Sequence, residues 1–138
     1  LKEGDLVLAM DRPWIKAGLK YSMISKSDLP SLLVQRTACL RSGENLENPF
    51  LRYVISSPKF IRHILGVQTG LGVPHISGGQ IKNFEFFLPS LAEQRTIVTK
   101  VDALSAETKK LEEIYERKLV ALEELRKSVL QKAFAGEL

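Results

Sequence analysis

The chain has 138 residues, and among them are one cysteine, Cys39, and two histidines. A single cysteine excludes an internal disulfide bond and fits a reducing compartment. No apolar run comes near the roughly 20 residues that a membrane-spanning helix needs, and the first residues do not form a signal peptide. We therefore expect a cytoplasmic protein without a membrane partner.

Motifs for catalysis and cofactor binding are missing from the sequence. His63 and His75 each lack a cysteine or carboxylate at metal-ligand spacing. There is no P-loop, no nucleophile elbow and no glycine motif for a dinucleotide. We predict no catalytic residue, no metal and no cofactor, and we expect His63 to be a solvated residue on a basic helix.

Positive charge is unevenly distributed along the chain. Residues 1–90 contain 11 Lys and Arg against 7 Asp and Glu, whereas residues 91–138 contain 9 of each kind. The whole formal excess of +4 therefore falls on the first part, which favours a polyanionic partner such as nucleic acid. A mildly basic surface without such a partner explains the charge equally well.

The first part of the chain has the pattern of a small mixed domain. Apolar and β-branched runs between turn residues predict strands at 6–10, 21–24, 32–40 and 84–88. Asn48-Pro49 and Pro58 predict the starts of two short helices. Because a buried strand begins so close to Leu1, we expect a domain that is incomplete at its N-terminus.

A long helix accounts for the last third of the chain. Ser90 and Glu93 have capping-box spacing, and Gly136 is the expected stop signal. Between them, apolar residues recur at alternating spacings of four and three, as in a coiled-coil seam. The predicted helix-pairing residues are Ile97, Val101, Leu104, Leu111, Tyr115, Leu122, Leu125 and Val129. Thr108 and Lys118 also lie in register and weaken the seam locally.

The length of this helix predicts a partner. From residue 90 to residue 135 it would extend about 65–70 Å, at ~1.5 Å per residue. A domain of this size cannot cover that length with its own core, so we predict a second helix of similar length beside it. The simpler alternative is a helix packed entirely on its own domain.

Two polar loops, at 11–20 and 66–79, form the candidate binding surface. The first combines cations with a tryptophan, and the second places polar side chains among glycines that let a ligand approach the backbone. Such side chains hydrogen-bond base edges and phosphates. The candidate DNA-binding residues are Arg12, Trp14, Lys16, Lys20, Gln68, Thr69, His75, Ser77, Gln80 and Lys82. The alternative is that Trp14 belongs to the core and the others are ordinary loop residues.

The triplet Asn48-Pro49-Phe50 is similar to the Asn-Pro-Pro-Phe/Tyr motif of amino-methyltransferases. One proline is missing, however, and no glycine-rich cofactor turn accompanies the triplet. A helix start explains it fully. We therefore do not expect adenine methylation by this chain.

Several segments together have the pattern of one family. They are His75-Ile76-Ser77, Ile81-Lys82-Asn83-Phe84, the stretch 88–98 beginning Leu88-Pro89-Ser90-Leu91-Ala92-Glu93-Gln94-Arg95, and the terminal stretch 125–138. Residues 4–7 and 48–53 match weaker features. With these segments the chain resembles the specificity (S) subunit of type I restriction-modification systems over essentially its whole length.

The resemblance implies a division of labour. A full S subunit has two target recognition domains, each reading one half of a bipartite DNA sequence and each followed by a long helix. The two helices pair antiparallel and set the spacing of the half-sites, the same region docks methyltransferase (M) subunits, and the S subunit itself catalyses nothing. Because one recognition domain is present here, the chain fits the C-terminal part of a full S subunit or part of a half-length S subunit that dimerises.

The sequence therefore predicts an α+β fold with two parts. A mixed target recognition domain, incomplete at its N-terminus, spans 1–89, and a coiled-coil spacer and dimerisation helix spans 90–138. The predicted function is sequence-specific recognition of double-stranded DNA, with M subunits and a second antiparallel helix as partners. The alternative is a non-catalytic coiled-coil interaction module without specific DNA binding.

Overall fold

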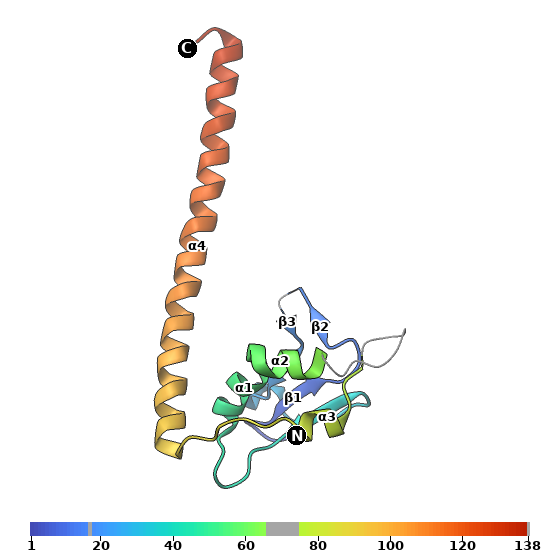
Figure 1. Cartoon of the computed structure of the whole chain (residues 1–138). Helices are drawn as coiled ribbons and strands as arrows, with labels where there is room; N and C mark the ends of the chain where they lie inside the picture. The colour runs from blue at the N-terminus through green and yellow to red at the C-terminus, as the bar shows by residue number, and fades with distance from the viewer. Residues whose placement is uncertain (17, 66–74, 138) are drawn as a thin grey trace. The chain divides into compact units, whose positions relative to one another are not determined.

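The computed structural model of the chain describes residues 1–16, 18–65 and 75–137, which divide into two compact units. The first unit is Leu1–Val98 and the second is Thr99–Leu138. Small sheets and short helices make up the first unit, and the second consists of the greater part of one long helix (Figure 1). The predicted α+β class with one long C-terminal helix is confirmed.

A three-stranded antiparallel sheet forms the centre of the first unit. β1 (Leu6–Ala9) lies between β4 (Tyr21–Met23) and β5 (Thr37–Leu40). In the register, Leu8 is opposite Tyr21 on one side and Ala38 on the other. The strands predicted at 6–10 and 21–24 are thus confirmed with slightly shorter bounds.

The segment 11–20, which the sequence predicts as a loop, contains a small hairpin. β2 (Trp14–Ile15) pairs with β3 (Gly18–Leu19), and Leu19 is buried in the core. Gly18 has a φ of 116°, a conformation that strongly favours glycine. After β4, the 3₁₀ turn η1 (Lys26–Asp28) follows.

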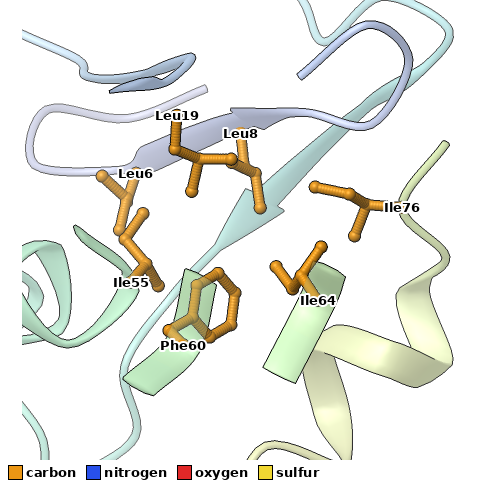
Figure 2. Close-up of a cluster of buried hydrophobic side chains, with 7 residues drawn as sticks. All are labelled: Leu6, Leu8, Leu19, Ile55, Phe60, Ile64 and Ile76. Carbon is orange, nitrogen blue, oxygen red and sulfur yellow. The ribbon is translucent and has the colours of Figure 1, made fainter. Parts of the chain in front are cut away.

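Two helices cover one face of the three-stranded sheet (Figure 1). α1 (Asn48–Ser56) and α2 (Pro58–Leu65) begin where their prolines predict, because proline fits the first turn of a helix. Side chains alternate along β1, so Leu6 and Leu8 point to these helices. The buried cluster comprises Leu6, Leu8, Leu19, Ile55, Phe60, Ile64 and Ile76 (Figure 2). Each such side chain contributes about 1.5–3 kcal/mol when fully buried.

The strand predicted at 32–40 is wrong over its first half. β1 offers four residues for pairing on this side, and Thr37–Leu40 occupies all of them. Leu32 and Val34 are 89% and 68% exposed and have no place in the ladder. The apolar run therefore extends beyond the length of its partner strand.

The strand predicted at 84–88 is also wrong. Residues 84–87 alternate in burial as a strand would, but the structure assigns them no pairing partner among the described residues. Phe84 instead packs edge-on against Phe60, with ring centroids 5.0 Å apart, and Phe86 stacks on Phe84 at 6.0 Å. Aromatic packing thus replaces the expected hydrogen-bond ladder.

The expectation of a solvated His63 is wrong as well. Its ring is half-buried at 5.2 Å from the ring of Phe84, and its Nε2 lies 3.0 Å from the carbonyl oxygen of Gln80. Gln80 belongs to α3 (Gly78–Lys82), a short helix absent from the sequence prediction. His63 therefore connects α2 to α3.

The long helix α4 (Leu91–Ala135) begins and ends as predicted. The Ser90 N–H donates to Glu93 Oε2 at 2.9 Å, and the Glu93 N–H donates to Ser90 Oγ at 3.4 Å, which forms the capping box. Hydrogen bonds from Ser90 also lower the pKa of the Glu93 carboxyl. Gly136 ends the helix with a φ of 72°.

Among the helices of the described ranges, none is long and apolar enough to cross a membrane.

Gln94, in the first turn of α4 and within the first unit, is fully buried. Its Nε2 donates to the carbonyl oxygens of Asn45 and Pro89, both at 2.9 Å, and its Oε1 accepts the Glu47 N–H at 3.0 Å. Arg95 adds an ion pair to the Glu47 carboxylate at 2.7 Å. The amide of Gln94 thus satisfies three main-chain groups of two separate segments.

A second polar anchor lies at the start of β1. The carboxylate of Asp5 accepts two hydrogen bonds from the Arg41 guanidinium, both at 2.6 Å, and one from the Lys2 N–H at 2.7 Å. The Asp5 side chain is 4% exposed, so the pairing compensates the burial of its charge. The Arg41 hydrogen bonds hold the pKa of the Asp5 carboxyl well below its usual range.

Replacing Gln94 by leucine should destabilise the first unit, because three main-chain groups lose their hydrogen-bond partner while the volume of the side chain changes little. We expect a loss of at least about 2 kcal/mol in the free energy of unfolding. Urea unfolding monitored by the fluorescence of Trp14 measures it. Gln131→Leu, at an exposed position of the same helix, is the control. Equal stabilities of both variants would contradict the anchoring role of Gln94.

Replacing Asp5 by asparagine should reduce stability in a pH-dependent manner. A depressed pKa means that the pair stabilises the fold fully above about pH 4, the pKa of an unfolded Asp, and less as the pH falls further. The urea midpoint of Asp5→Asn should therefore lie below that of the wild type at pH 7, with a gap that narrows towards pH 2. Glu44→Gln, in an exposed loop, serves as control. A constant gap would show that the charge of Asp5 is not the cause.

Candidate nucleic-acid interface

Three segments that are distant in sequence meet where β1 ends. The Met10 N–H donates to the Arg36 carbonyl oxygen at 2.8 Å, and the Ile76 N–H donates to the Met10 carbonyl oxygen at 2.7 Å. Asp11 and His75 form an isolated antiparallel bridge. The side chains that follow β1, precede β5 and precede α3 are therefore held at one end of the sheet.

Basic side chains gather at this end of the sheet. Lys20 joins them because its carbonyl oxygen accepts the Ala9 N–H at 3.0 Å. Lys16 stands on the turn of the neighbouring β2–β3 hairpin. We give the name basic end to the exposed residues Arg12, Lys20, Arg36 and His75 together with Lys16 of the hairpin. Such a group of donors is suited to phosphates and to acceptor groups on base edges.

The carboxylate of Asp11 lies within the basic end and contacts two of its members. Asp11 Oδ2 pairs with Arg36 Nε at 3.2 Å, and Oδ1 forms a short contact with His75 Nδ1. Arg12 and Arg36 both have positive φ values, 45° and 65°, which are uncommon for residues other than glycine. The backbone at both positions thus adopts a costly conformation next to Asp11.

The structure separates two predicted DNA-binding residues from this surface. Trp14 packs against the core cluster, and its buried Nε1 has no hydrogen-bond partner in the part of the chain that the structure describes. Lys82 lines a pocket together with Cys39 and Arg41, beyond the opposite end of β5 from Arg36. The packing of Trp14 therefore favours the alternative prediction, in which Trp14 belongs to the core.

Other predicted residues have local roles or cannot be placed. Ser77 and Gln80 form the capping box of α3: the Ser77 N–H donates to Gln80 Oε1 at 2.7 Å, and the Gln80 N–H donates to Ser77 Oγ at 3.2 Å. Gln68 and Thr69 lie outside the described residues. Of the ten predicted residues, the basic end thus unites Arg12, Lys16, Lys20 and His75.

Arg36 was missed by the sequence analysis. Arg36 lies within the run predicted as a strand, and a single arginine in a strand indicates only an outward-facing side chain. Its side chain is in fact 75% exposed at the residue that turns into β5. Only the pairing of β5 with β1 shows that Arg36 is next to Asp11.

The structure gives the triplet Asn48-Pro49-Phe50 a purely architectural explanation. Asn48 Nδ2 donates to the Gly4 carbonyl oxygen at 2.6 Å, and Asn48 Oδ1 accepts the Ser42 N–H at 2.8 Å. Phe50 is buried. Both the oxygen and the nitrogen of the Asn48 amide therefore connect loop segments.

Within residues 1–16, 18–65 and 75–137, no group of three or more His, Cys, Asp or Glu is placed to hold a metal ion.

Comparison with known proteins assigns the chain to a family. Residues 2–118 match the sequence model of the type I restriction modification DNA specificity domain. The chain is 44% identical over 115 residues to the type I restriction enzyme EcoAI specificity subunit of Escherichia coli, an alignment that covers 83% of the chain and 19% of that subunit.

Two further relatives have the same description. The MjaVIII specificity subunit of Methanocaldococcus jannaschii is 27% identical over 139 residues, which cover 100% of the chain and 32% of that protein. The EcoKI specificity subunit of Escherichia coli K12 is 34% identical over 90 residues, which cover 64% of the chain and 19% of that protein. The chain thus spans between a fifth and a third of the length of these curated relatives.

Proposed function

The chain belongs to the family of type I restriction-modification DNA specificity domains, and we propose that it reads one half of a bipartite DNA sequence through its basic end. Membership in a family of specificity domains agrees with the expectation of a recognition protein and not an enzyme. The complete subunit would act in the cytoplasm with methyltransferase (M) subunits. In the proposed division, residues 1–89 recognise DNA and residues 90–138 form the spacer helix.

The basic end is the observation that carries this proposal. Its five members are exposed and come from three segments of the sequence. Arg12, Lys20, Arg36 and His75 lie at one end of the three-stranded sheet, and Lys16 lies on the turn of the β2–β3 hairpin. The first unit contains 12 Lys and Arg against 8 Asp and Glu, and the second contains 8 of each. Phosphate contacts supply most of the affinity of such a surface, and base contacts supply its specificity.

The helix α4 supports the proposed spacer role. Seven of the eight predicted helix-pairing residues are exposed in the single chain, and Val101 is half-buried. Leu104 and Leu122 are 63% and 61% exposed. A continuous apolar stripe of this length is stable in water when a second helix covers it. We propose that this second helix is antiparallel, from the same polypeptide or from another copy, and that the pair docks M subunits.

The two weak seam positions are compatible with pairing. The hydroxyl of Thr108 donates to the Leu104 carbonyl oxygen at 2.9 Å, so its polar group is satisfied within the helix. The Lys118 ammonium lies 5.5 Å from the centre of the Tyr115 ring. Leu119, the next residue, is 66% exposed and extends the stripe beside Lys118. The seam therefore widens at this point and is not broken.

The competing function is a coiled-coil interaction module without specific DNA binding. The same exposed stripe on α4 favours it, and the charge of the first unit would then be incidental. The two functions differ in what the basic end contributes. Removing its charge should impair DNA binding only if the first function is right.

Charge reversal at Arg12 and Lys16 should weaken DNA binding and leave assembly unchanged. If each side chain contacts a phosphate, the slope of log K against log salt should fall by about 0.9 per lost contact. We expect an affinity at least about tenfold lower for Arg12→Glu combined with Lys16→Glu. Fluorescence anisotropy with duplexes selected from a random pool measures both quantities.

Lys26→Glu is the matched control for this experiment. Lys26 is an exposed residue of η1, beyond the end of β4 that pairs with Leu6, and thus at the opposite end of the sheet. Its reversal should change affinity much less. A similar loss of DNA affinity in Lys26→Glu and in the double variant would indicate non-specific electrostatic attraction. Equal affinity of the wild type for every duplex would favour the interaction module.

Replacing Leu111 and Leu122 by glutamine should prevent self-association through α4. In this chain the second helix must come from another copy, so each double variant removes four leucines from the dimer. Because burial of one leucine contributes about 1.5–3 kcal/mol, dimerisation should weaken by far more than tenfold. Sedimentation equilibrium at micromolar concentration measures the change.

Glu113→Gln combined with Glu124→Gln provides the matched control. Each lies two residues beyond a leucine, about 200° around the helix axis, and therefore on the opposite face. This variant should dimerise like the wild type. A wild type that stays monomeric at all concentrations, or a leucine variant that still dimerises, would contradict pairing through the predicted seam.

A further inference from the structure

Asp11 is an acidic residue in the middle of a surface that otherwise attracts anions. Its two carboxylate oxygens have different basic partners: Oδ2 faces Arg36 Nε at 3.2 Å, and Oδ1 faces His75 Nδ1. Main-chain hydrogen bonds from Met10 and Ile76 fix the same three segments. The carboxylate therefore holds two side chains that would otherwise be independent.

This arrangement determines which atoms Arg36 and His75 direct outward. Arg36 uses Nε for Asp11, so its two Nη groups form the outer edge of an exposed guanidinium. His75 is 54% exposed, and its Nδ1 faces a carboxylate, which requires the proton on Nδ1. Neutral His75 then has Nε2 as a hydrogen-bond acceptor. The two side chains that Asp11 contacts thus offer two donor groups and, in the neutral ring, one acceptor.

On the premise of the proposed DNA recognition, we propose that Asp11 is a positioning residue that presents Arg36 and His75 to one G·C base pair in the major groove. Guanine offers O6 and N7 as acceptors for the two Nη groups of Arg36. The paired cytosine offers its N4 amino group as a donor for Nε2 of His75. The donor and acceptor pattern of the protein matches that of the pair.

Other ligands match this pattern less well. Adenine has a single acceptor, N7, beside an amino donor, so the two donors of Arg36 would face one acceptor and one donor. A phosphate has acceptors only and leaves Nε2 of His75 without a donor. The carboxylate of Asp11 would also repel a phosphate at this point. The cluster is therefore suited to a base edge, whereas Arg12, Lys16 and Lys20 suit the phosphates.

Selection of duplexes from a random pool by the whole chain tests this inference. The wild type should select one position as G·C, and an A·T pair there should weaken binding on the order of tenfold. Asp11→Asn and Arg36→Lys should each abolish that preference and keep the preferences at other positions. Lys20→Gln, which removes a charge of the basic end away from Asp11, should weaken binding to all duplexes alike.

The outcomes separate this inference from the proposed function. If the Asp11→Asn variant keeps the G·C preference, or binds all duplexes more weakly by the same factor, the positioning role of Asp11 is overturned. If Asp11→Asn proves unfolded in a urea titration, Arg36→Lys decides alone, because it keeps the charge and loses the paired donors. A wild type that prefers a sequence independently of Asp11 overturns this inference only, whereas a wild type that binds no duplex overturns both.

Discussion

The buried amide of Gln94 is the interaction on which the junction of the chain depends. It satisfies main-chain groups of Asn45, Glu47 and Pro89, so the loop before α1 and the segment before α4 are held by one side chain. Its neighbours complete the junction, since Glu93 caps α4 and Arg95 pairs with Glu47. An apolar side chain in its place would leave three groups unpaired. Consecutive residues thus specify both the start of the helix and its attachment.

Signals confined to one turn of the chain allowed the starts of α1, α2 and α4 to be predicted. Ser90 with Glu93, and the prolines at 49 and 58, fixed helix starts because their effect depends on adjacent residues. The same logic was available for α3, whose Ser77 and Gln80 have capping-box spacing. The failures at 32–36 and 84–88 have another origin. Apolar alternation reports which side chains are buried, whereas a strand also requires a partner of matching length.

The candidate site was less predictable because it is assembled over long distances. Asp11 and His75 are 64 residues apart in sequence, and their contact depends on how the chain returns to the end of β1. Loop composition sufficed to select Arg12, Lys16, Lys20 and His75. It could not select Arg36, which composition assigned to a strand, or separate Lys82 from the others. The pairing of β5 with β1 contains this information, and no local pattern encodes it.

The two units expose different kinds of surface, one charged and one apolar, and these surfaces respond differently to salt. All excess positive charge belongs to the first unit, while the second has none and exposes an apolar stripe. The proposed binding of DNA through the basic end would weaken as the salt concentration rises, since it would depend on the release of counterions. Helix pairing depends on apolar burial, which salts such as sulfate strengthen. If both proposals hold, recognition and assembly can be varied independently, and added salt would release DNA while the helices remain paired. The proposed spacer would have to stay paired while the recognition surfaces bind and release DNA, and different dependences on salt would permit this.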